Sequence, residues 1–228
     1  DGGRVINLHG QPELSARNVA VPGDISSAAF PLVSALLTAG SEITINNVGI
    51  NPLRCGLIET LLEMGGRIEL ENQRTKAGEA IADLRLTASP LIGIDVPAER
   101  APAMIDEYPV LAIAAACATG STRLSGLAEL RLKESDRLAG MVRGLAACGV
   151  DVEEGEDFLV IHGTGAPPAG GATIATELDH RMAMAFLVLG GVSENPVAID
   201  DGGPIDTSFP GFAGLMNGLG CNIKETSS

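Results

Sequence analysis

The stretch LLEMGGRIELEN, residues 61–72, passes from an apolar helical pattern through a glycine into a short strand that carries acidic residues. The same succession returns in LAACGVDVEEGE, residues 145–156, and in MNGLGCNIKE, residues 216–225. The aligned glycines, separated by 84 and 71 residues, are Gly65, Gly149 and Gly220. Self-similarity of this kind predicts an internal structural repeat.

A second marker runs in parallel with the first. ALLTAGSEITI (35–45), ACATGSTRLSG (116–126) and LGGVSENPVAID (189–200) each pass from a helical pattern through a glycine into a strand. These glycines, separated by 80 and 71 residues, are Gly40, Gly120 and Gly191. Two markers with nearly matching offsets predict three copies of an α-β-α-β unit, with extra strands between copies.

The two helices of each unit differ in character. The first helices, FPLVSALLTAG (30–40), YPVLAIAAACATG (108–120) and HRMAMAFLVLGG (180–191), are apolar nearly all round, which predicts burial on every side. The second helices are amphipathic. In residues 135–149 the apolar positions i, i+3, i+4 and i+7 are Leu138, Met141, Val142 and Leu145. We therefore expect one pseudo-threefold α/β domain with three buried central helices.

The composition narrows the class of protein. Hydrophobic residues make up 45% and charged residues 19% of the 228, which predicts a folded core. Aromatic residues are only 3%, so this core must be aliphatic. The net charge of −14 opposes binding to nucleic acid and to anionic membranes. There is no run of 18 apolar residues and no signal peptide, so we expect a cytoplasmic protein.

Four cysteines, Cys55, Cys117, Cys148 and Cys221, stand far apart and form no C-x-x-C pair. This spacing favours neither a metal site nor a disulfide framework. The first twenty residues do not fit the repeat: GRVINLHG (3–10) alternates like a strand, and QPELSARN (11–18) is a turn-rich connector. Because the chain begins at Asp1 and not at Met, we expect a piece of a longer protein.

The stretch LRLKESDRLAG, residues 130–140, concentrates charge directly before an amphipathic helix. We expect Glu134 or Ser135 to open that helix. An acidic residue in a first turn is ordinary helix stabilisation, but cations there oppose the helix dipole unless an anion lies between them. The cations in question are Arg131, Lys133 and Arg137. Because helix N-termini bind anions readily, the stretch predicts an anion site.

Two other helix starts carry charge. In ELDHRMAMAF, residues 177–186, Asp179 is expected to cap the helix and Arg181 to lie in its first turn, while His180 is expected to be a hydrogen-bonded histidine and not a catalyst. In PAMIDEYPVLAIA, residues 102–114, Asp106 and Glu107 immediately precede a wholly apolar helix. N-capping explains one of the two, but such a helix would bury its own start, so a carboxylate there is a candidate base.

In VPGDISSAAF, residues 21–30, the same place holds Asp24, Ser26 and Ser27, which need be nothing more than caps. Repeated helix starts at one end of a pseudo-threefold domain would converge on one surface. The residues expected there are Asp106, Lys133, Glu134, Arg137 and Arg181. Cations suit an oxyanion substrate and carboxylates suit proton transfer, so chemistry on a phosphorylated acid is indicated.

RLKESDRLAGM, residues 131–141, resembles the R-x-K-E-[ST]-D-R signature of the 5-enolpyruvylshikimate-3-phosphate synthase family, the 3-phosphoshikimate 1-carboxyvinyltransferases. LDHRMAM, VPGDISSAAF and TSFPGF resemble three further family segments in the family's order. IDEYPVLAIAAA and VSENPV look like the class II, glyphosate-tolerant branch. The resemblance covers almost the whole chain but only the second half of the family's protein.

The resemblance implies a fold and a partner. In that family, two similar domains of three βαβαββ units each close on substrate. Residues 21–228 would form one enolpyruvyl-transferase domain with repeats at about 21–95, 96–165 and 166–228. Residues 1–20 would be the end of the other domain and the crossover. The expected partner is the missing N-terminal domain of the same enzyme.

The resemblance also implies a reaction in the shikimate pathway towards chorismate and the aromatic amino acids. The 5-hydroxyl of shikimate 3-phosphate adds to phosphoenolpyruvate and inorganic phosphate is expelled, with no metal or organic cofactor. Asp106 matches the proton acceptor that contacts the shikimate ring, and Glu134 matches the proton donor. Lys133 matches a contact to the shikimate 3-phosphate, and Arg137 and Arg181 match the arginines that hold phosphoenolpyruvate.

Two positions depart from the family. Thr207 stands where many members carry a lysine that binds phosphoenolpyruvate, and Glu129 stands where others carry an asparagine that contacts the shikimate phosphate. The family's first-half substrate contacts are absent, so we expect the chain to be inactive alone. Two alternatives remain: a UDP-N-acetylglucosamine enolpyruvyl transferase, which lacks the KESDR signature, and a non-catalytic binding or assembly module.

Overall fold

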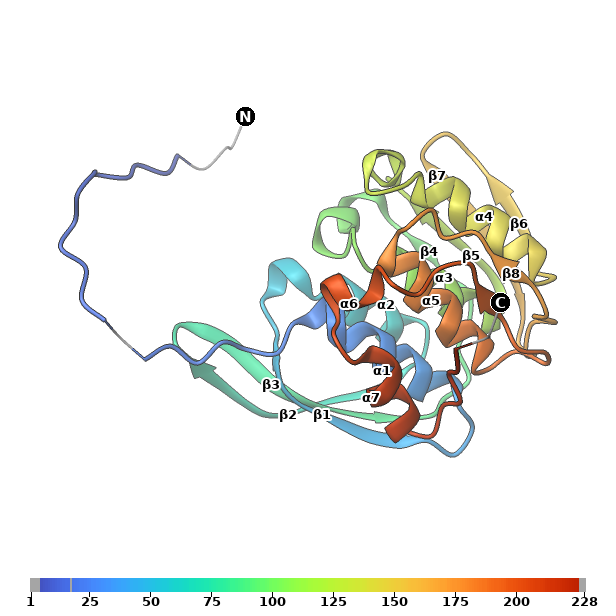
Figure 1. Ribbon diagram of the computed structural model, residues 1–228, viewed down its shortest axis with the longest axis horizontal. Coiled ribbons are helices and arrows are strands. Elements are labelled where there is room, and N and C mark those ends of the chain that lie inside the picture. Colours follow the sequence, from blue (N-terminus) through green and yellow to red (C-terminus); the bar gives the residue numbers. More distant parts are fainter. Residues whose placement is uncertain (1–4, 17, 226–228) are drawn as a thin grey trace.

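The computed structural model describes residues 5–16 and 18–225, and Figure 1 shows them as three successive units of helices and strands. The first unit holds α1 (Ile25–Leu37), β1 (Glu42–Gly49), the 3₁₀ helix η1 (Pro52–Arg54), α2 (Gly56–Glu63), β2 (Arg67–Lys76) and β3 (Glu79–Thr87). The second holds β4 (Asp95–Val96), η2 (Ala98–Ala103), α3 (Tyr108–Cys117), β5 (Thr119–Ser125), η3 (Ala128–Leu132), α4 (Arg137–Ala147), β6 (Asp151–Glu154) and β7 (Phe158–Thr164). The third holds β8 (Thr173–Ile174), α5 (His180–Gly190), β9 (Ala198–Ile199), α6 (Ile205–Ser208) and α7 (Phe212–Gly218).

Each unit has its own sheet. The strand orders are β1-β3-β2, β4-β5-β7-β6 and β8-β9. In every unit the strand before the central helix is parallel to the strand after it: a single bridge joins Gly23 to Val48 in the first, and β4–β5 and β8–β9 pair in the others. An antiparallel hairpin completes the first two sheets. The expected βαβαββ order is therefore visible in full in the second unit.

The first helices of the three units, α1, α3 and α5, pack against one another between the sheets (Figure 1). All residues of α3 from Tyr108 to Ala116 are buried, and α1 and α5 are buried over most of their length. This burial confirms the expectation of apolar central helices. The outer helix α4 also follows the prediction, since Leu138, Met141 and Leu145 are buried and Val142 is half-buried.

The outer helix α4 lies very close to the central helix α5. A Cβ added at Gly144 would come within 2.1 Å of Phe186 Cζ, so only a residue without a side chain fits there. The aromatic ring of Phe186 is itself buried. This contact couples the second unit to the third in the core.

The C-terminal segment differs from the prediction. No strand follows Gly220 in the described part of the chain, and residues 221–225 are irregular. The Ile223 N–H donates to Asn217 Oδ1 (2.7 Å), and Asn217 Nδ2 donates back to the Ile223 carbonyl (2.8 Å). A strand forms when its backbone groups bond to a neighbouring strand. Here the Asn217 side chain bonds to the backbone of Ile223 instead. Cys221 at the start of this segment lies beside α1, with its Sγ 3.9 Å from the Ser34 hydroxyl, and Phe212 of α7 meets Phe30 of α1 edge-on at 5.9 Å.

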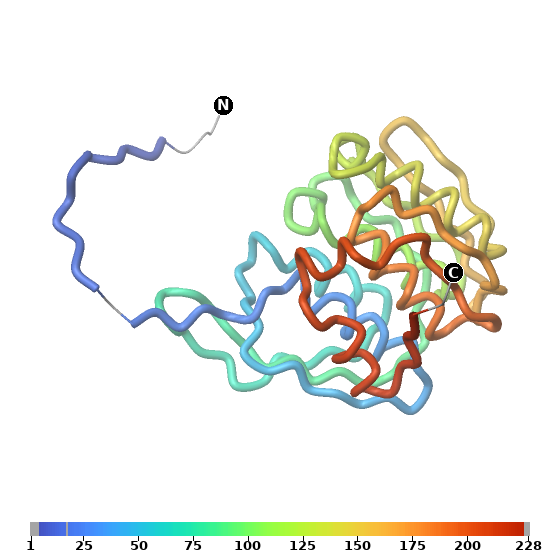
Figure 2. Tube along the Cα trace, in the orientation of Figure 1, coloured from blue at the N-terminus to red at the C-terminus, as the bar shows by residue number. Residues whose placement is uncertain are grey.

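The N-terminal segment leaves the folded body as an extended trace (Figure 2). Residues 5–16 form neither helix nor strand, so the strand expected over 3–10 is not formed in its described part, residues 5–10. Its apolar side chains, among them Val5, Ile6 and Leu8, are more than four-fifths exposed. The assignment of residues 1–20 to another domain stays a prediction. The repeat boundaries also stay predictions, and the boundary at residue 95 falls inside β4.

Candidate active site

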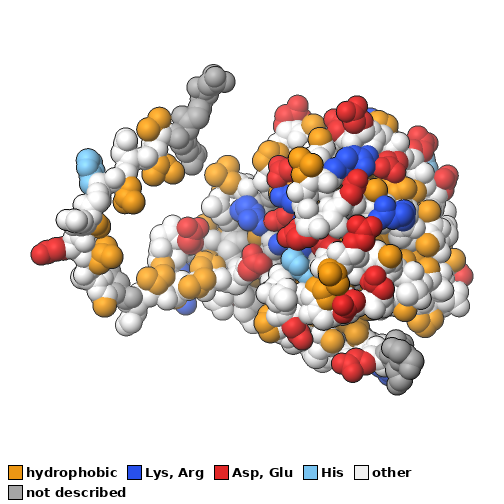
Figure 3. Space-filling view, turned by 45° about the horizontal axis from the view of Figure 1, so that its top comes forward, with side chains coloured by type: hydrophobic (Ala, Val, Ile, Leu, Met, Phe, Trp, Pro, Cys, Tyr) orange, Lys and Arg blue, Asp and Glu red, His pale blue; other side chains and the backbone are white. Residues whose placement is uncertain are grey.

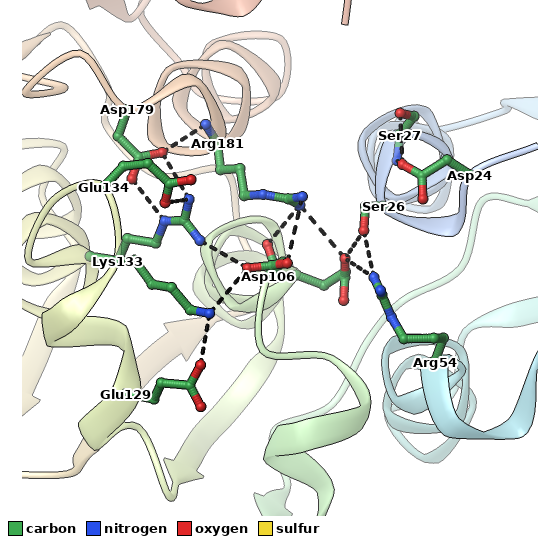
Figure 4. A network of polar contacts seen from close by, with 12 residues as sticks. Asp24, Ser26, Ser27, Arg54, Asp106, Glu129, Lys133, Glu134, Asp179 and Arg181 are labelled. Carbon is green, nitrogen blue, oxygen red and sulfur yellow. Dashed lines mark hydrogen bonds and ion pairs between the residues drawn. The ribbon is translucent and has the colours of Figure 1, made fainter. Parts of the chain in front are cut away.

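The starts of the three central helices meet at one end of the domain (Figure 4). Ser26 in the first turn of α1 donates to the carboxylate of Glu107, which precedes α3. Arg181 in the first turn of α5 donates through Nη1 to the Asp106 carbonyl (3.2 Å). The five residues expected at this surface belong to one connected network of ion pairs, which the start of α4 completes.

Arg137 is the centre of this network and is fully buried, with 0% of its side chain exposed. Its Nε donates to Asp179 Oδ2 (2.8 Å), its Nη1 donates to Asp106 Oδ1 (3.1 Å), and its Nη2 donates to Glu134. A buried guanidinium is tolerated only when carboxylates pair with it and take its hydrogen bonds. The anions at this helix start are therefore three carboxylates of the protein itself.

The helix α4 begins later than expected. Its first residue is Arg137, and Asp136 is its N-cap, accepting from the Ala139 N–H (3.0 Å). The expected start at Glu134 or Ser135 is therefore wrong by two or three residues, because the extended backbone of Asp136 and its carboxylate supply the cap. Lys133 and Glu134 consequently lie in the connection before the helix.

Asp179 does more than the capping expected of it. Its Oδ1 accepts from the backbone N–H groups of Arg181 (2.9 Å) and Met182 (3.3 Å), as a cap does. Its Oδ2 accepts from Arg137 and from the Ser135 hydroxyl (3.1 Å). Burial would raise the pKa of this carboxyl, but the hydrogen bond and charge of Arg137, together with the backbone bonds, outweigh it and lower the pKa. Asp179 is thus the buried counter-charge of Arg137.

Asp106 is the carboxylate that the cations surround. Besides Arg137, its oxygens lie 3.8 Å from Lys133 Nζ and 3.7 Å from Arg181 Nη2. Its side chain is 29% exposed, so a solute can reach it. Lys133 Nζ also donates to Glu129 Oε1 (2.8 Å). Asp106 is therefore an accessible carboxylate held among three cations, in a position to accept a proton from a nearby hydroxyl.

Glu134 differs from the other acids of the network because half of its side chain, 51%, is exposed. Its described contact is the ion pair with Arg137. Because Glu134 is exposed and Arg137 is buried, Glu134 can move away and leave its place on Arg137 to another anion. Arg131, by contrast, is directed away from the network: it donates to Glu154 Oε1 (2.8 Å) and to the Gly155 carbonyl (2.8 Å), which ties η3 to the β6–β7 hairpin.

Ser26 and Arg54 were not expected in the network, and Glu107 was expected only as one of the two carboxylates before the apolar helix. Glu107 is buried, with its side chain 1% exposed, and Arg54 Nη2 donates to the Ser26 hydroxyl (2.8 Å). Ser26 was expected to be only a cap, and that is wrong: Asp24 caps α1, and Ser26 joins the site. Arg54 lies between the second strand and second helix of its unit, where Lys133 lies in the second unit, and this correspondence could have identified it.

The pKa of the Glu107 carboxyl is raised. Burial is the largest cause, and it outweighs the Ser26 hydrogen bond and the charges of Arg181 and Arg54, which act in the opposite direction.

Acidic and basic side chains are intermixed on the face of the molecule seen in Figure 3. Such an arrangement can hold a small oxyanion and transfer protons.

Among the residues that the structure describes, no group of three or more His, Cys, Asp or Glu side chains could hold a metal ion. None of the helices within residues 5–16 and 18–225 has the length and apolar character needed to cross a membrane.

Residues 1–216 match the family model described as EPSP synthase (3-phosphoshikimate 1-carboxyvinyltransferase). The chain is 63% identical over 223 residues to the 3-phosphoshikimate 1-carboxyvinyltransferase of Paramagnetospirillum magneticum, with 98% of this chain and 50% of that protein covered. It is 61% identical to the protein of the same name from Rhodospirillum rubrum, with 98% and 49% covered. The chain therefore spans about half the length of the curated relatives it matches.

Solved structures give the same picture. The EPSP synthase of Acinetobacter baumannii, 44% identical, superposes with a TM-score of 0.89 over 93% of this chain and 49% of that one. The enolpyruvyl transferase NikO of Streptomyces tendae superposes with a TM-score of 0.74 over 92% of this chain and 46% of that one. At 18% identity the second likeness concerns the fold alone. The expected enolpyruvyl-transferase-like fold is thereby confirmed.

Proposed function

The chain belongs to the EPSP synthase family, and from this premise we propose that it supplies half of the active site for transfer of the enolpyruvyl group. The group passes from phosphoenolpyruvate to the 5-hydroxyl of shikimate 3-phosphate, and inorganic phosphate is released. The observation that carries the proposal is the pair of acids around Arg137: Asp106, enclosed by three cations, and the half-exposed Glu134.

The two acids take different parts in the reaction. Asp106 accepts the proton of the attacking hydroxyl, because its side chain is 29% exposed and therefore within reach of a bound substrate. Glu134 delivers a proton to the methylene carbon of phosphoenolpyruvate. Each well-placed acid or base is worth about 10²–10⁴ in rate. In the elimination, the carbon–oxygen bond to phosphate breaks, Glu134 takes one proton back from the methyl carbon to restore the double bond, and the proton held by Asp106 leaves with the phosphate.

Arg137 and Arg181 hold the phosphoenolpyruvate. The donors of Arg137 are occupied by carboxylates of the protein, and of these Glu134 is the exposed one. The substrate carboxylate takes the place of Glu134 on Arg137, as one carboxylate exchanges for another with little change in electrostatic energy. This exchange frees the Glu134 carboxylate from its ion pair, so that it can take up a proton from solvent and pass it to the methylene carbon. Arg181, 15% exposed, supplies a second positive charge.

Lys133 contacts the phosphate of shikimate 3-phosphate by exchanging its present partner, Glu129, for the substrate. We place the reaction in the cytoplasm, and the four free thiols at Cys55, Cys117, Cys148 and Cys221 support this, since thiols persist in reducing compartments. The partner is the other half of the family's protein, because the chain spans only half of its relatives. Without that half we expect no turnover by the purified chain.

The test is phosphate release from phosphoenolpyruvate and shikimate 3-phosphate by this chain co-expressed with a family first half. Glu134→Gln should abolish activity, since an amide cannot donate the proton. Glu42→Gln is the matched control, because Glu42 is equally exposed (56%) and pairs with Arg85 on the far sheet.

An assembled complex without activity would contradict the proposal and favour the non-catalytic assembly module. Full activity of Glu134→Gln would contradict the role given to this residue. Turnover by the chain alone would refute the requirement for the other half.

A further inference from the structure

One carboxyl oxygen in the network has no partner. Glu107 Oε2 is buried and makes no hydrogen bond in the part of the chain that the structure describes. Leaving a buried acceptor unpaired is costly, and native proteins do so rarely. The side chain lies in the middle of the site, since its other oxygen accepts from Ser26 of the first unit. Such an orphan indicates that the group changes its bonding or its charge during function.

Two guanidinium groups approach the same carboxylate from opposite sides without bonding to it. Arg54 Nη2 and Arg181 Nη1 lie 3.6 Å and 3.7 Å from Glu107 Oε1, which is beyond a good hydrogen bond. The Arg54 side chain is 44% exposed, and its one described hydrogen bond goes to the Ser26 hydroxyl. Both guanidinium groups therefore keep donors for a ligand.

The charges that face Glu107 come from three elements. Arg54 comes from η1, Arg181 from α5 and Asp106 from the segment before α3, while α1 contributes the uncharged Ser26 hydroxyl. Arg137 of α4 reaches Asp106 instead. Asp106 is also paired with Arg137 and Lys133, so a dianion placed between Arg54 and Arg181 competes with the Glu107 carboxylate for their positive charge. Burial already raises the pKa of Glu107, so this carboxyl is the group most easily neutralised.

We propose that Arg54 and Arg181 form an oxyanion subsite and that Glu107 takes up one proton from solvent when a dianion binds there. Glu107 is thus a positioning residue: ionised, it attracts the two arginines towards itself, and neutral, it leaves their charge to the ligand. The natural ligand is the phosphate group of a substrate, a point that rests on the proposed function. Proton uptake makes the affinity of the subsite fall as the pH rises.

Sulfate is the probe, because it remains a dianion across the working pH range and any proton exchanged must come from the protein. The heat of sulfate binding to the 228-residue chain is measured by calorimetry in two buffers of different ionisation heat, at several pH values. We expect up to one proton taken up per site, and an affinity that falls by up to about tenfold per pH unit above the folded pKa of Glu107.

Three variants test whether these residues form the subsite. Glu107→Gln should bind sulfate without proton uptake and with an affinity that no longer depends on pH. Arg54→Ala should weaken sulfate binding by about tenfold or more, since it removes a charged hydrogen-bond donor. Arg143→Ala is the matched control, because Arg143 is similarly exposed (54%) and pairs with Glu177 on the outer surface; its affinity should not change.

The proposal is overturned if sulfate does not bind, if Arg54→Ala binds as tightly as Arg143→Ala, or if Glu107→Gln takes up protons like the parent chain. Should Glu107→Gln fail to fold, Ser26→Ala takes its place. Loss of the Ser26 donor raises the pKa of Glu107 further, so the fall in affinity must move to higher pH, and an unmoved profile refutes the coupling. Sulfate binding needs no second domain, so its outcome is independent of the turnover assay.

Discussion

Replacing Asp179 by Asn tests the idea that the site is built on one buried ion pair. The side chains of Arg137 and Asp179 are both 0% exposed, and Nε and Oδ2 are 2.8 Å apart. An Asn retains an oxygen that can accept from the backbone N–H groups of Arg181 and Met182, so the cap of α5 survives. The substitution therefore keeps the cap but removes the charge and the hydrogen bonds that Oδ2 accepts from Arg137 and Ser135, because the amide nitrogen that replaces Oδ2 is a donor.

The magnitude follows from burial. Removing one partner of a buried ion pair costs about 3–5 kcal/mol when the other charge is left uncompensated. Arg137 keeps its part-exposed partners Asp106 and Glu134, so the cost should lie at the lower end of this range. With a urea dependence of about 3 kcal/mol per molar, suited to a chain of this size, the unfolding midpoint should fall by about 1–2 M. Combining Asp179→Asn with Arg137→Met removes the orphaned charge as well, so the double variant should recover part of the lost free energy of unfolding.

Urea unfolding of the chain, followed by circular dichroism, measures these differences. Glu177→Gln is the control, because its ion pair with Arg143 is half exposed on both sides (50% and 54%) and should be worth less than about 1 kcal/mol. A cost for Asp179→Asn as small as that of the control would refute the reasoning. The reasoning would also be refuted if the double variant lost as much free energy of unfolding as the two single changes added together.

Two further predictions concern stability. The pKa of Asp179 is lowered in the folded chain, so its contribution to the free energy of unfolding is present above the unfolded pKa of about 4 and is lost as the pH falls through the folded pKa. The urea midpoint should therefore drop in acid, and less steeply in Asp179→Asn. Parallel pH profiles of the two proteins would contradict this assignment. Gly144→Ala should cost about 1–3 kcal/mol in unfolding free energy, because its Cβ would meet the Phe186 ring at 2.1 Å. Gly218→Ala, with nothing within 4 Å, should be neutral or stabilising, and equal costs for the two would exclude a steric cause.

The sequence by itself determined the repeat, the three apolar central helices and the presence of charged helix starts, because these are patterns of neighbouring residues. Periodicity decides which face of a helix is apolar, whatever the rest of the chain does. The same holds for the cap at Asp179 and for the stripe of Leu138, Met141 and Leu145, which the structure confirms.

Only the tertiary structure decided which charges meet. Arg137 and Asp179 are 42 residues apart in the sequence, and Ser26 and Glu107 are 81 residues apart, so no local sequence pattern predicts either contact. Residues 221–225 have the composition of a strand but no neighbour to pair with in the described chain. Hydrogen bonding and desolvation depend on distance in space, and these energies exist only once the three units have packed together.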